Sequence, residues 1–126
     1  MVWKAPIPLP ARSPVAMVPD IGDICWVELD PIRGTEQSGR RPALFMTDKK
    51  FHRIAKRAII LPITRRDRPW AFHQALPDGL EVHGFVMVDQ IRVIDIAQRT
   101  SGYIDRLNQS DLLVYQKLLA TLLHIR

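Results

Sequence analysis

Short apolar, β-forming stretches separated by polar loops run through the middle of the chain, and residues 70–76 also alternate in the way that is typical of half-buried β-strands. The expected strands cover residues 24–29, 42–47, 70–76, 84–88 and 91–96. A further run, 58–63, is apolar throughout and rich in β-branched residues. It predicts a central strand covered on both faces. Pro62 lies near the end of this run and indicates that strand pairing stops there, because proline has no N–H to donate.

One helix is predicted at the end of the chain. Leucines and Tyr115 recur at helical spacing as far as Ile125, and Asn108 or Ser110 can cap the first turn. The polar segment 48–56 is expected to be a loop with a single helical turn. Five to seven short strands and one amphipathic helix favour a β-rich α+β fold, built as a small, strongly curved barrel.

The first twenty residues differ from the rest of the chain. They hold five of the ten prolines, so residues 1–20 are expected to form a poorly ordered arm ahead of one domain over 21–126. The prolines interrupt any signal-peptide core, and no window reaches the roughly 18 apolar residues of a membrane helix. A single cysteine excludes an internal disulfide. These features predict a cytoplasmic protein that does not bind membranes.

Basic residues gather in one segment. Residues 40–68 contain ten Arg and Lys against two Asp, a net charge of +8, whereas the whole chain carries +5. Thirteen of the eighteen basic residues are arginines, whose planar guanidinium suits two-pronged contacts with phosphate. The charge favours nucleic acid or an acidic protein segment as a partner. The alternative is a solvated basic face that binds nothing.

Metal-dependent chemistry is not expected. The four histidines, at positions 52, 73, 83 and 124, lack the spacing of a zinc site, and no group of carboxylates has the spacing of a magnesium site. His73, in an alternating strand, is expected to be structural. RNA can be cleaved without metal or cofactor because its own 2′-hydroxyl is the nucleophile. A protein then has to take that proton, stabilise charge on the phosphate and help the 5′-oxygen leave.

Candidate residues for these tasks lie in loops and at strand ends, where binding groups tend to gather. Arg41, at a loop-to-strand junction, could stabilise the phosphate, and Thr64, where the apolar strand ends, could donate a hydrogen bond to it. Either Glu36 or Asp89 could transfer the proton. Weaker explanations exist, since Arg41 could pair with Asp30 on the surface and Thr64 could simply end its strand.

These residues fall within short motifs that span about residues 21–96. The motifs are Gly22-Asp23-Ile24, Trp26-Val27, Asp30-Pro31, Gly34-Thr35-Glu36-Gln37, Arg41-Pro42, Leu61-Pro62-Ile63-Thr64 and Gly84-Phe85-Val86-Met87-Val88-Asp89-Gln90. Their order resembles that of the MazF/PemK (Kid) family of toxin endoribonucleases. The Gly-x-Glu-Gln loop followed by Arg-Pro is the distinctive part of the resemblance.

The resemblance implies an SH3-like β-barrel that acts as a homodimer and is held in check by an acidic antitoxin. It also implies sequence-specific cleavage of single-stranded messenger RNA, which leaves a 2′,3′-cyclic phosphate and a 5′-hydroxyl. Arg41 and Thr64 stand at the family's catalytic positions. The residues implied to line the RNA groove are Glu36, Gln37, Asp89 and Gln90.

Two departures limit what can be carried over. Some members have a histidine before the Glu-Gln pair and an arginine two residues before the aspartate, whereas this chain has Thr35 and Met87 there. An acid–base scheme that needs those side chains does not apply, and the proton acceptor stays open between Glu36 and Asp89.

Specificity for a base sequence is expected from the loop after the central strand. Arg65 and Arg66 carry phosphate-binding charge, and Trp70 offers a ring on which an unstacked base could lie. Packing within the barrel is the favoured role for Phe72.

Two other functions compete with that of an RNA-cleaving toxin. A CcdB-like poison would bind DNA gyrase through a C-terminal Trp-Gly-Ile, but this chain ends in Leu123-His124-Ile125-Arg126. A barrel that binds RNA without cutting it is the other alternative.

Overall fold

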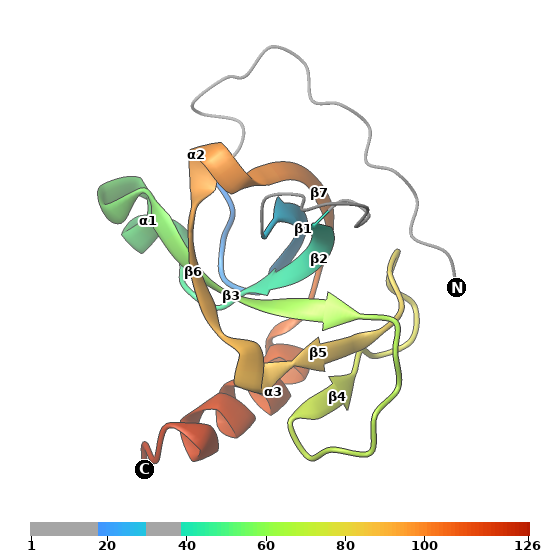
Figure 1. Cartoon of the computed structure of the whole chain (residues 1–126). Helices are drawn as coiled ribbons and strands as arrows, with labels where there is room; N and C mark the ends of the chain where they lie inside the picture. The colour runs from blue at the N-terminus through green and yellow to red at the C-terminus, as the bar shows by residue number, and fades with distance from the viewer. Residues whose placement is uncertain (1–17, 30–38) are drawn as a thin grey trace.

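The computed structural model describes residues 18–29 and 39–126. The predicted arm up to residue 17 and the loop residues Glu36 and Gln37 lie outside the described residues. The elements, shown in Figure 1, are β1 (Asp23–Glu28), β2 (Arg40–Phe45), α1 (Lys49–Ala55), β3 (Arg57–Thr64), β4 (His73–Ala75), β5 (Phe85–Met87), the 3₁₀ turn η1 (Val88–Gln90), β6 (Arg92–Asp95), α2 (Ile96–Arg99), β7 (Thr100–Arg106) and α3 (Gln109–Leu122).

The strands form one antiparallel sheet in the order β4-β5-β3-β2-β1-β7, with β6 also paired to β3. The apolar run predicted as a central strand is β3, which pairs with β2, β5 and β6. Figure 1 shows the sheet curving strongly, with α2 and α3 at its opposite ends. The predicted β-rich α+β fold with an antiparallel sheet and a C-terminal helix is confirmed.

Alternate residues of the strands belong to two different hydrophobic clusters, one on each side of the sheet. In β1, Ile24 belongs to the first cluster, whereas Cys25 and Val27 belong to the second. Leu112 and Tyr115 of α3 complete the first cluster. The two-residue period of a strand therefore gives this small domain two cores, which together hold the curved sheet.

Several predicted boundaries were wrong. Strand β7 was not predicted, because Gly102 and charged residues break its apolar pattern, and it is held in the sheet by pairing with β1. The segment 70–76 contains a strand only over His73–Ala75. The loop expected over 48–56 holds the seven-residue helix α1, and α3 ends at Leu122, before Ile125.

Pro62 does not end β3. Ala43 faces Pro62 in the last pair between β2 and β3, and Ile63 and Thr64 then pair with β5. Proline removes one donor from the ladder, but a strand with partners on two sides can continue by pairing with a different neighbour.

A buried histidine holds α1 and the start of the described chain together. The side chain of His52 is 2% exposed. Its Nδ1 lies 2.7 Å from the carbonyl oxygen of Pro19 and its Nε2 lies 2.7 Å from Oγ1 of Thr47. Asp20 accepts a hydrogen bond from Arg106 at 3.0 Å. Residues 18–20, which belong to the predicted arm, thus contact the domain.

Tyr115 ties α3 to the strand beside the site. Asn108 caps this helix by accepting from the amide of Asp111 at 2.8 Å. The hydroxyl of Tyr115 donates to the carbonyl oxygen of Ala75 in β4 at 2.7 Å. Burial raises the pKa of Tyr115 to about 12. This residue therefore has to stay protonated for the helix to remain packed as it is.

Replacing the tyrosine hydroxyl should reveal this linkage. Tyr115→Phe should lower the free energy of unfolding by about 1 kcal/mol at pH 8, the usual net value of a hydrogen bond. Because the pKa of Tyr115 is raised in the folded state, from 10.0 to about 12, the wild-type protein should lose stability as the pH rises through that window. The variant should lose less, as measured by urea denaturation at pH 8 and pH 11.5. Equal losses in both proteins would contradict the assignment.

Candidate active site

A polar cavity of about 570 Å³ opens where β2 and β3 diverge. Four arginines and one aspartate contribute to its wall, so its charge is strongly positive. The lining residues are Leu29, Arg41, Pro62, Thr64, Arg66, Asp67, Arg68, Pro69, His73, Met87, Gln90 and Arg92.

The register of β2 and β3 explains why Arg41 and Thr64 meet here. Ala43 pairs with Pro62, and continuing that antiparallel register by two residues brings Arg41 opposite Thr64. Because side chains two residues apart share a face, both point to the same side of the sheet. The amide of Met46 donates to the carbonyl oxygen of Ile59, so in this alternating ladder the nitrogen of Pro42 also faces β3. Because Pro42 has no N–H to donate, the ladder loses a bond there, and pairing of β2 with β3 ends at Ala43 and Pro62. A cavity lined by both side chains follows from the pairing.

Arg41 is exposed at the start of β2, directly after the loop that joins it to β1. On its other side β2 pairs with β1, where Arg41 faces Val27. That core residue is 0% exposed, so the backbone that carries the guanidinium is rigid. The neighbouring Arg40 instead pairs with Glu28, at 3.8 Å, and does not line the cavity. The two adjacent arginines thus have different environments.

Thr64 is the last residue of β3 and is partly exposed. Its Oγ1 accepts a hydrogen bond from the amide of Arg66 at 3.2 Å, a local contact that starts the charged loop. Since the oxygen is the acceptor in this bond, the hydroxyl hydrogen can donate to a ligand in the cavity. The bond also turns the loop so that Arg66 and Arg68 line the same cavity.

Two further lining residues were not selected from the sequence. Arg92, in β6, donates to the carbonyl oxygen of Leu29 at 2.8 Å, which links β6 to the end of β1. No local pattern marks it, because β6 reaches the cavity by pairing with β3. His73, expected to be structural, faces Met87 across the β4–β5 pair. His73 and Met87 both line the cavity, and the buried Nδ1 of His73 has no hydrogen-bond partner among residues 18–29 and 39–126.

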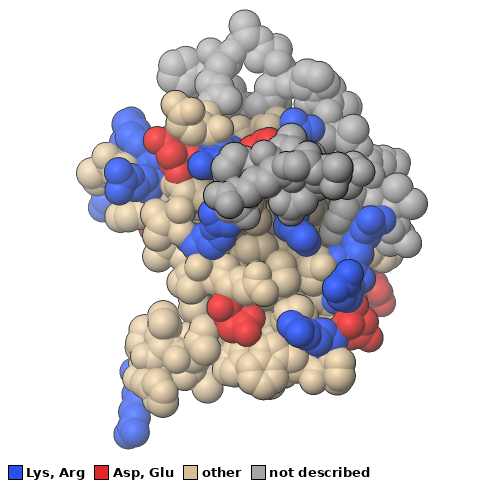
Figure 2. Space-filling view, viewed as in Figure 1, with Lys and Arg blue, Asp and Glu red and all other residues tan. Residues whose placement is uncertain are grey.

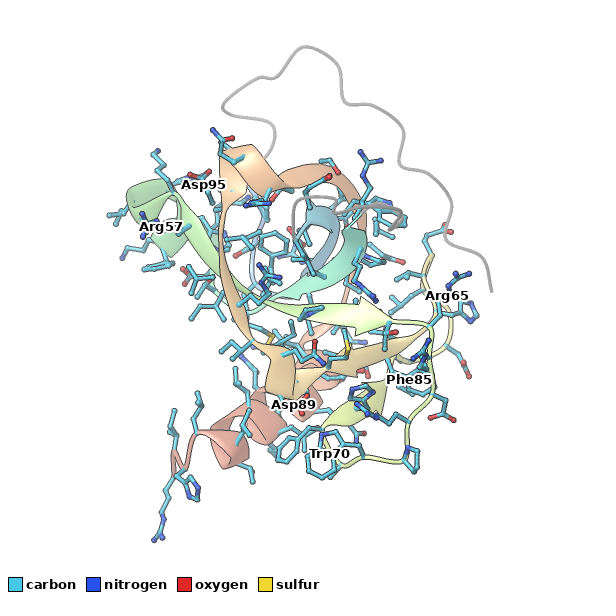
Figure 3. All side chains as sticks on the ribbon, viewed as in Figure 1. Arg57, Arg65, Trp70, Phe85, Asp89 and Asp95 are labelled. Carbon is cyan, nitrogen blue, oxygen red and sulfur yellow. The ribbon has the colours of Figure 1, made fainter. Side chains whose placement is uncertain are left out.

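The other predicted RNA-contacting residues divide into two groups. Gln90 lines the cavity, whereas Arg65, Trp70 and Asp89 do not. Nε1 of Trp70 donates to Oδ2 of Asp89 at 2.8 Å, and Figure 3 shows these two residues together, at a distance from Arg65. Trp70 and Asp89 are the direct neighbours of the lining residues Pro69 and Gln90, so the pair forms part of the cavity's rim.

The basic side chains on one face of the molecule lie in separate groups. Figure 2 shows several groups of Lys and Arg on the face in view, with uncharged surface and an acidic spot between them. Over residues 18–29 and 39–126, no cluster of three or more His, Cys, Asp or Glu side chains is placed to hold a metal ion. Burial raises the pKa of Cys25, whose thiol lies in the second core and is not placed to act as a nucleophile.

No helix in the described part of the chain is both long enough and apolar enough to span a membrane.

The arrangement of the site suits an anionic ligand. Guanidinium groups from β2, β6 and the loop after β3 converge on one space, with a hydroxyl donor beside them. Such donors bind phosphate oxygens and stabilise charge that develops on them.

Comparison with known proteins identifies the family of this chain. Residues 20–123 match the family described as PemK-like, MazF-like toxin of type II toxin-antitoxin system. The chain is 34% identical over 85 residues to the endoribonuclease toxin MazF of Escherichia coli K12, covering 68% of this chain and 74% of that protein. Endoribonuclease EndoA of Bacillus subtilis is 31% identical over 101 residues, covering 73% and 83% of the two chains.

The fold has solved counterparts as well. The MazE–MazF crystal structure (Form-II) from Deinococcus radiodurans contains a chain that superposes with a TM-score of 0.79 and 30% identity, over 87% of this chain and 99% of the other. The predicted family resemblance is confirmed. This chain belongs to the PemK-like, MazF-like family of endoribonuclease toxins of type II toxin–antitoxin systems.

Proposed function

We propose that this protein cleaves single-stranded messenger RNA at a short sequence, without a metal ion, in the arginine-lined cavity between β2 and β3. The observation that carries the proposal is the convergence of Arg41 and Thr64 on one cavity from two paired strands. Neither residue is needed there for packing, since Arg41 is exposed and Thr64 is partly exposed. Their family positions, noted from the sequence, supply the second support.

The reaction requires no group beyond the RNA and this chain. The 2′-oxygen attacks the adjacent phosphorus and gives its proton to a base, the bond from phosphorus to the 5′-oxygen breaks, and the 5′-oxygen takes up a proton from that protonated base. A 2′,3′-cyclic phosphate and a 5′-hydroxyl result. Arg41 stabilises the extra negative charge of the five-coordinate phosphorus, and Thr64 donates a hydrogen bond to a non-bridging oxygen.

The proton acceptor is proposed to be Glu36. Arginine stays protonated and is a poor resting base, so Arg41 cannot take this role. One carboxylate oxygen of Asp89 is occupied by the indole of Trp70, and Asp89 does not line the cavity. Glu36 belongs to the loop that leads into Arg41 in the sequence.

An acidic antitoxin segment is the proposed regulator. Four arginines line the cavity against one aspartate, and a disordered acidic segment could cross this space and exclude RNA. The similar Deinococcus radiodurans crystal structures are of MazE together with MazF.

We further propose a homodimer. Leu113 and Val114 on α3 are 45% and 48% exposed and offer an apolar surface for it.

Incubating the purified protein with a long RNA in EDTA tests the proposed activity. Fragments that end in a 2′,3′-cyclic phosphate and a 5′-hydroxyl are the expected products, and sequencing the 5′-hydroxyl ends would give the cut site. Binding to RNA without fragments would indicate an RNA-binding barrel, and inhibition of gyrase would indicate a CcdB-like toxin.

Arg41→Ala should reduce kcat for RNA cleavage by about 100-fold or more, the usual cost of removing a donor from a developing oxyanion. Because the side chain is exposed, the free energy of unfolding should change by less than about 0.5 kcal/mol. Arg40→Ala is the matched control, since it removes the same charge one residue away from the cavity and should leave kcat nearly unchanged. Loss of folding in the Arg41 variant would make this residue structural.

Thr64→Val should slow cleavage by about tenfold or more, because a transition-state hydrogen bond worth about 1.4 kcal/mol accounts for one decade in rate. Thr64→Ser keeps the hydroxyl and should retain most of the activity. Single-turnover cleavage of one RNA under saturating enzyme measures the chemical step in both variants. Equal rates for valine and threonine would remove Thr64 from the mechanism.

A further inference from the structure

We infer that Asp89 is a positioning residue that holds the indole of Trp70 as a stacking platform for one unpaired base of the RNA, at the rim of the cavity. The inference rests on the proposed function, because it names how that site would hold its substrate. It assigns Asp89 a role other than contact with RNA or transfer of a proton.

Four contacts restrain Trp70. Its Nε1 donates to Oδ2 of Asp89 at 2.8 Å, and its ring meets that of Phe72 edge-on, with centroids 5.5 Å apart and planes at 61°. Its backbone amide donates to the carbonyl oxygen of Arg68 at 2.7 Å, and its own carbonyl accepts from the amide of His73 at 2.9 Å. The backbone and the ring plane are therefore both held in place.

The ring is nevertheless open to solvent. Trp70 is 48% exposed, whereas Trp26 of β1 is 8% exposed. An indole that served to fill the core would be buried, and a rigid, half-exposed indole is costly unless something covers it. A preorganised aromatic face loses little entropy when it binds. Bases of single-stranded nucleic acid stack on such faces whatever their sequence.

The position of Trp70 fits a base next to the scissile phosphate. Both of its neighbours along this rim, Pro69 and His73, line the cavity, as does Gln90 beside Asp89. Figure 3 shows Trp70 and Asp89 side by side at the end of the sheet that carries β4 and β5. A nucleotide whose phosphate is bound by the cavity arginines would thus have this ring within reach of a neighbouring base.

Asp89 fits a positioning role chemically. An indole N–H is a donor without acceptor capacity, so its partner has to be an acceptor. A carboxylate that faced the RNA directly would repel its phosphates. With one oxygen turned to the indole, Asp89 instead determines where the ring lies. Asparagine could supply the same acceptor without the charge, which makes the role separable from proton transfer.

Three substitutions separate the roles. Asp89→Asn keeps an acceptor for the indole and should leave kcat and KM within about threefold of wild type. Asp89→Ala should raise KM by about three- to tenfold at constant kcat, and Trp70→Phe, which keeps a ring but loses the Nε1 proton, should do the same. The double variant Asp89→Ala/Trp70→Phe should be no worse than either single one, because both remove one interaction. Asp95→Asn, at the far end of the sheet in Figure 3, is the control for loss of a carboxylate charge.

Loss of kcat in Asp89→Asn by 100-fold or more would overturn the inference and make Asp89 an acid–base residue. Additive effects in the double variant would overturn it as well. The chain has three tryptophans, so the indole N–H resonance of Trp70 can be assigned by its loss in Trp70→Phe. Adding an oligonucleotide that is 2′-deoxy at every position, and so cannot be cleaved, should shift this resonance in the wild type and in Asp89→Asn. No shift at saturation would contradict stacking even if cleavage occurs, whereas a shift in a protein that cleaves no RNA would reject the proposed function and retain the platform.

Discussion

The pairing of Ala43 with Pro62 between β2 and β3 is the constraint on which the site depends. It sets the register that brings Arg41 across from Thr64, and the missing N–H of Pro42, which faces β3, ends the pairing there. The register itself is held by burial, since Leu44 faces Leu61 and both are 0% exposed. A slip of one residue would turn every core side chain to the wrong face of the sheet. Hydrophobic packing thus determines the placement of two polar groups.

The cavity brings several positive charges close together, and their repulsion has to be offset by packing elsewhere in the fold. Its four arginines come from β2, β6 and the loop after β3, and like charges around one space repel one another. Two separate cores hold these elements in place, and the second one contains Val27, Phe45 and Ile60. An anion in the cavity would relieve the repulsion. The same feature that lowers the stability of the empty protein therefore favours binding of a phosphate chain or an acidic peptide.

This chain differs from some members of the family at two positions near the motifs named from the sequence. The positions at which some members have a histidine and an arginine hold Thr35 and Met87 here. Met87 lines the cavity opposite His73, and the aspartate that follows it by two residues bonds to an indole. Arg41 and Thr64, the groups proposed to act on the phosphate, are present, whereas the groups around them differ. We expect differences of this kind to affect which nucleotide binds, and to affect the cleavage reaction less.

The sequence by itself determined the fold class, the central strand β3, the C-terminal helix, and Arg41 and Thr64 as the candidate pair. These follow from local periodicity and from motifs, which the order of residues records directly. It missed β7 and Arg92 because both depend on pairing between distant segments, and it placed Asp89 and Trp70 as separate RNA contacts because nothing local links residues 19 positions apart. Only the tertiary structure joined Asp89 to Trp70 and brought Arg92 and His73 to the cavity. Cross-strand neighbours are chosen by which faces can be buried together, and that choice is made by the whole sheet.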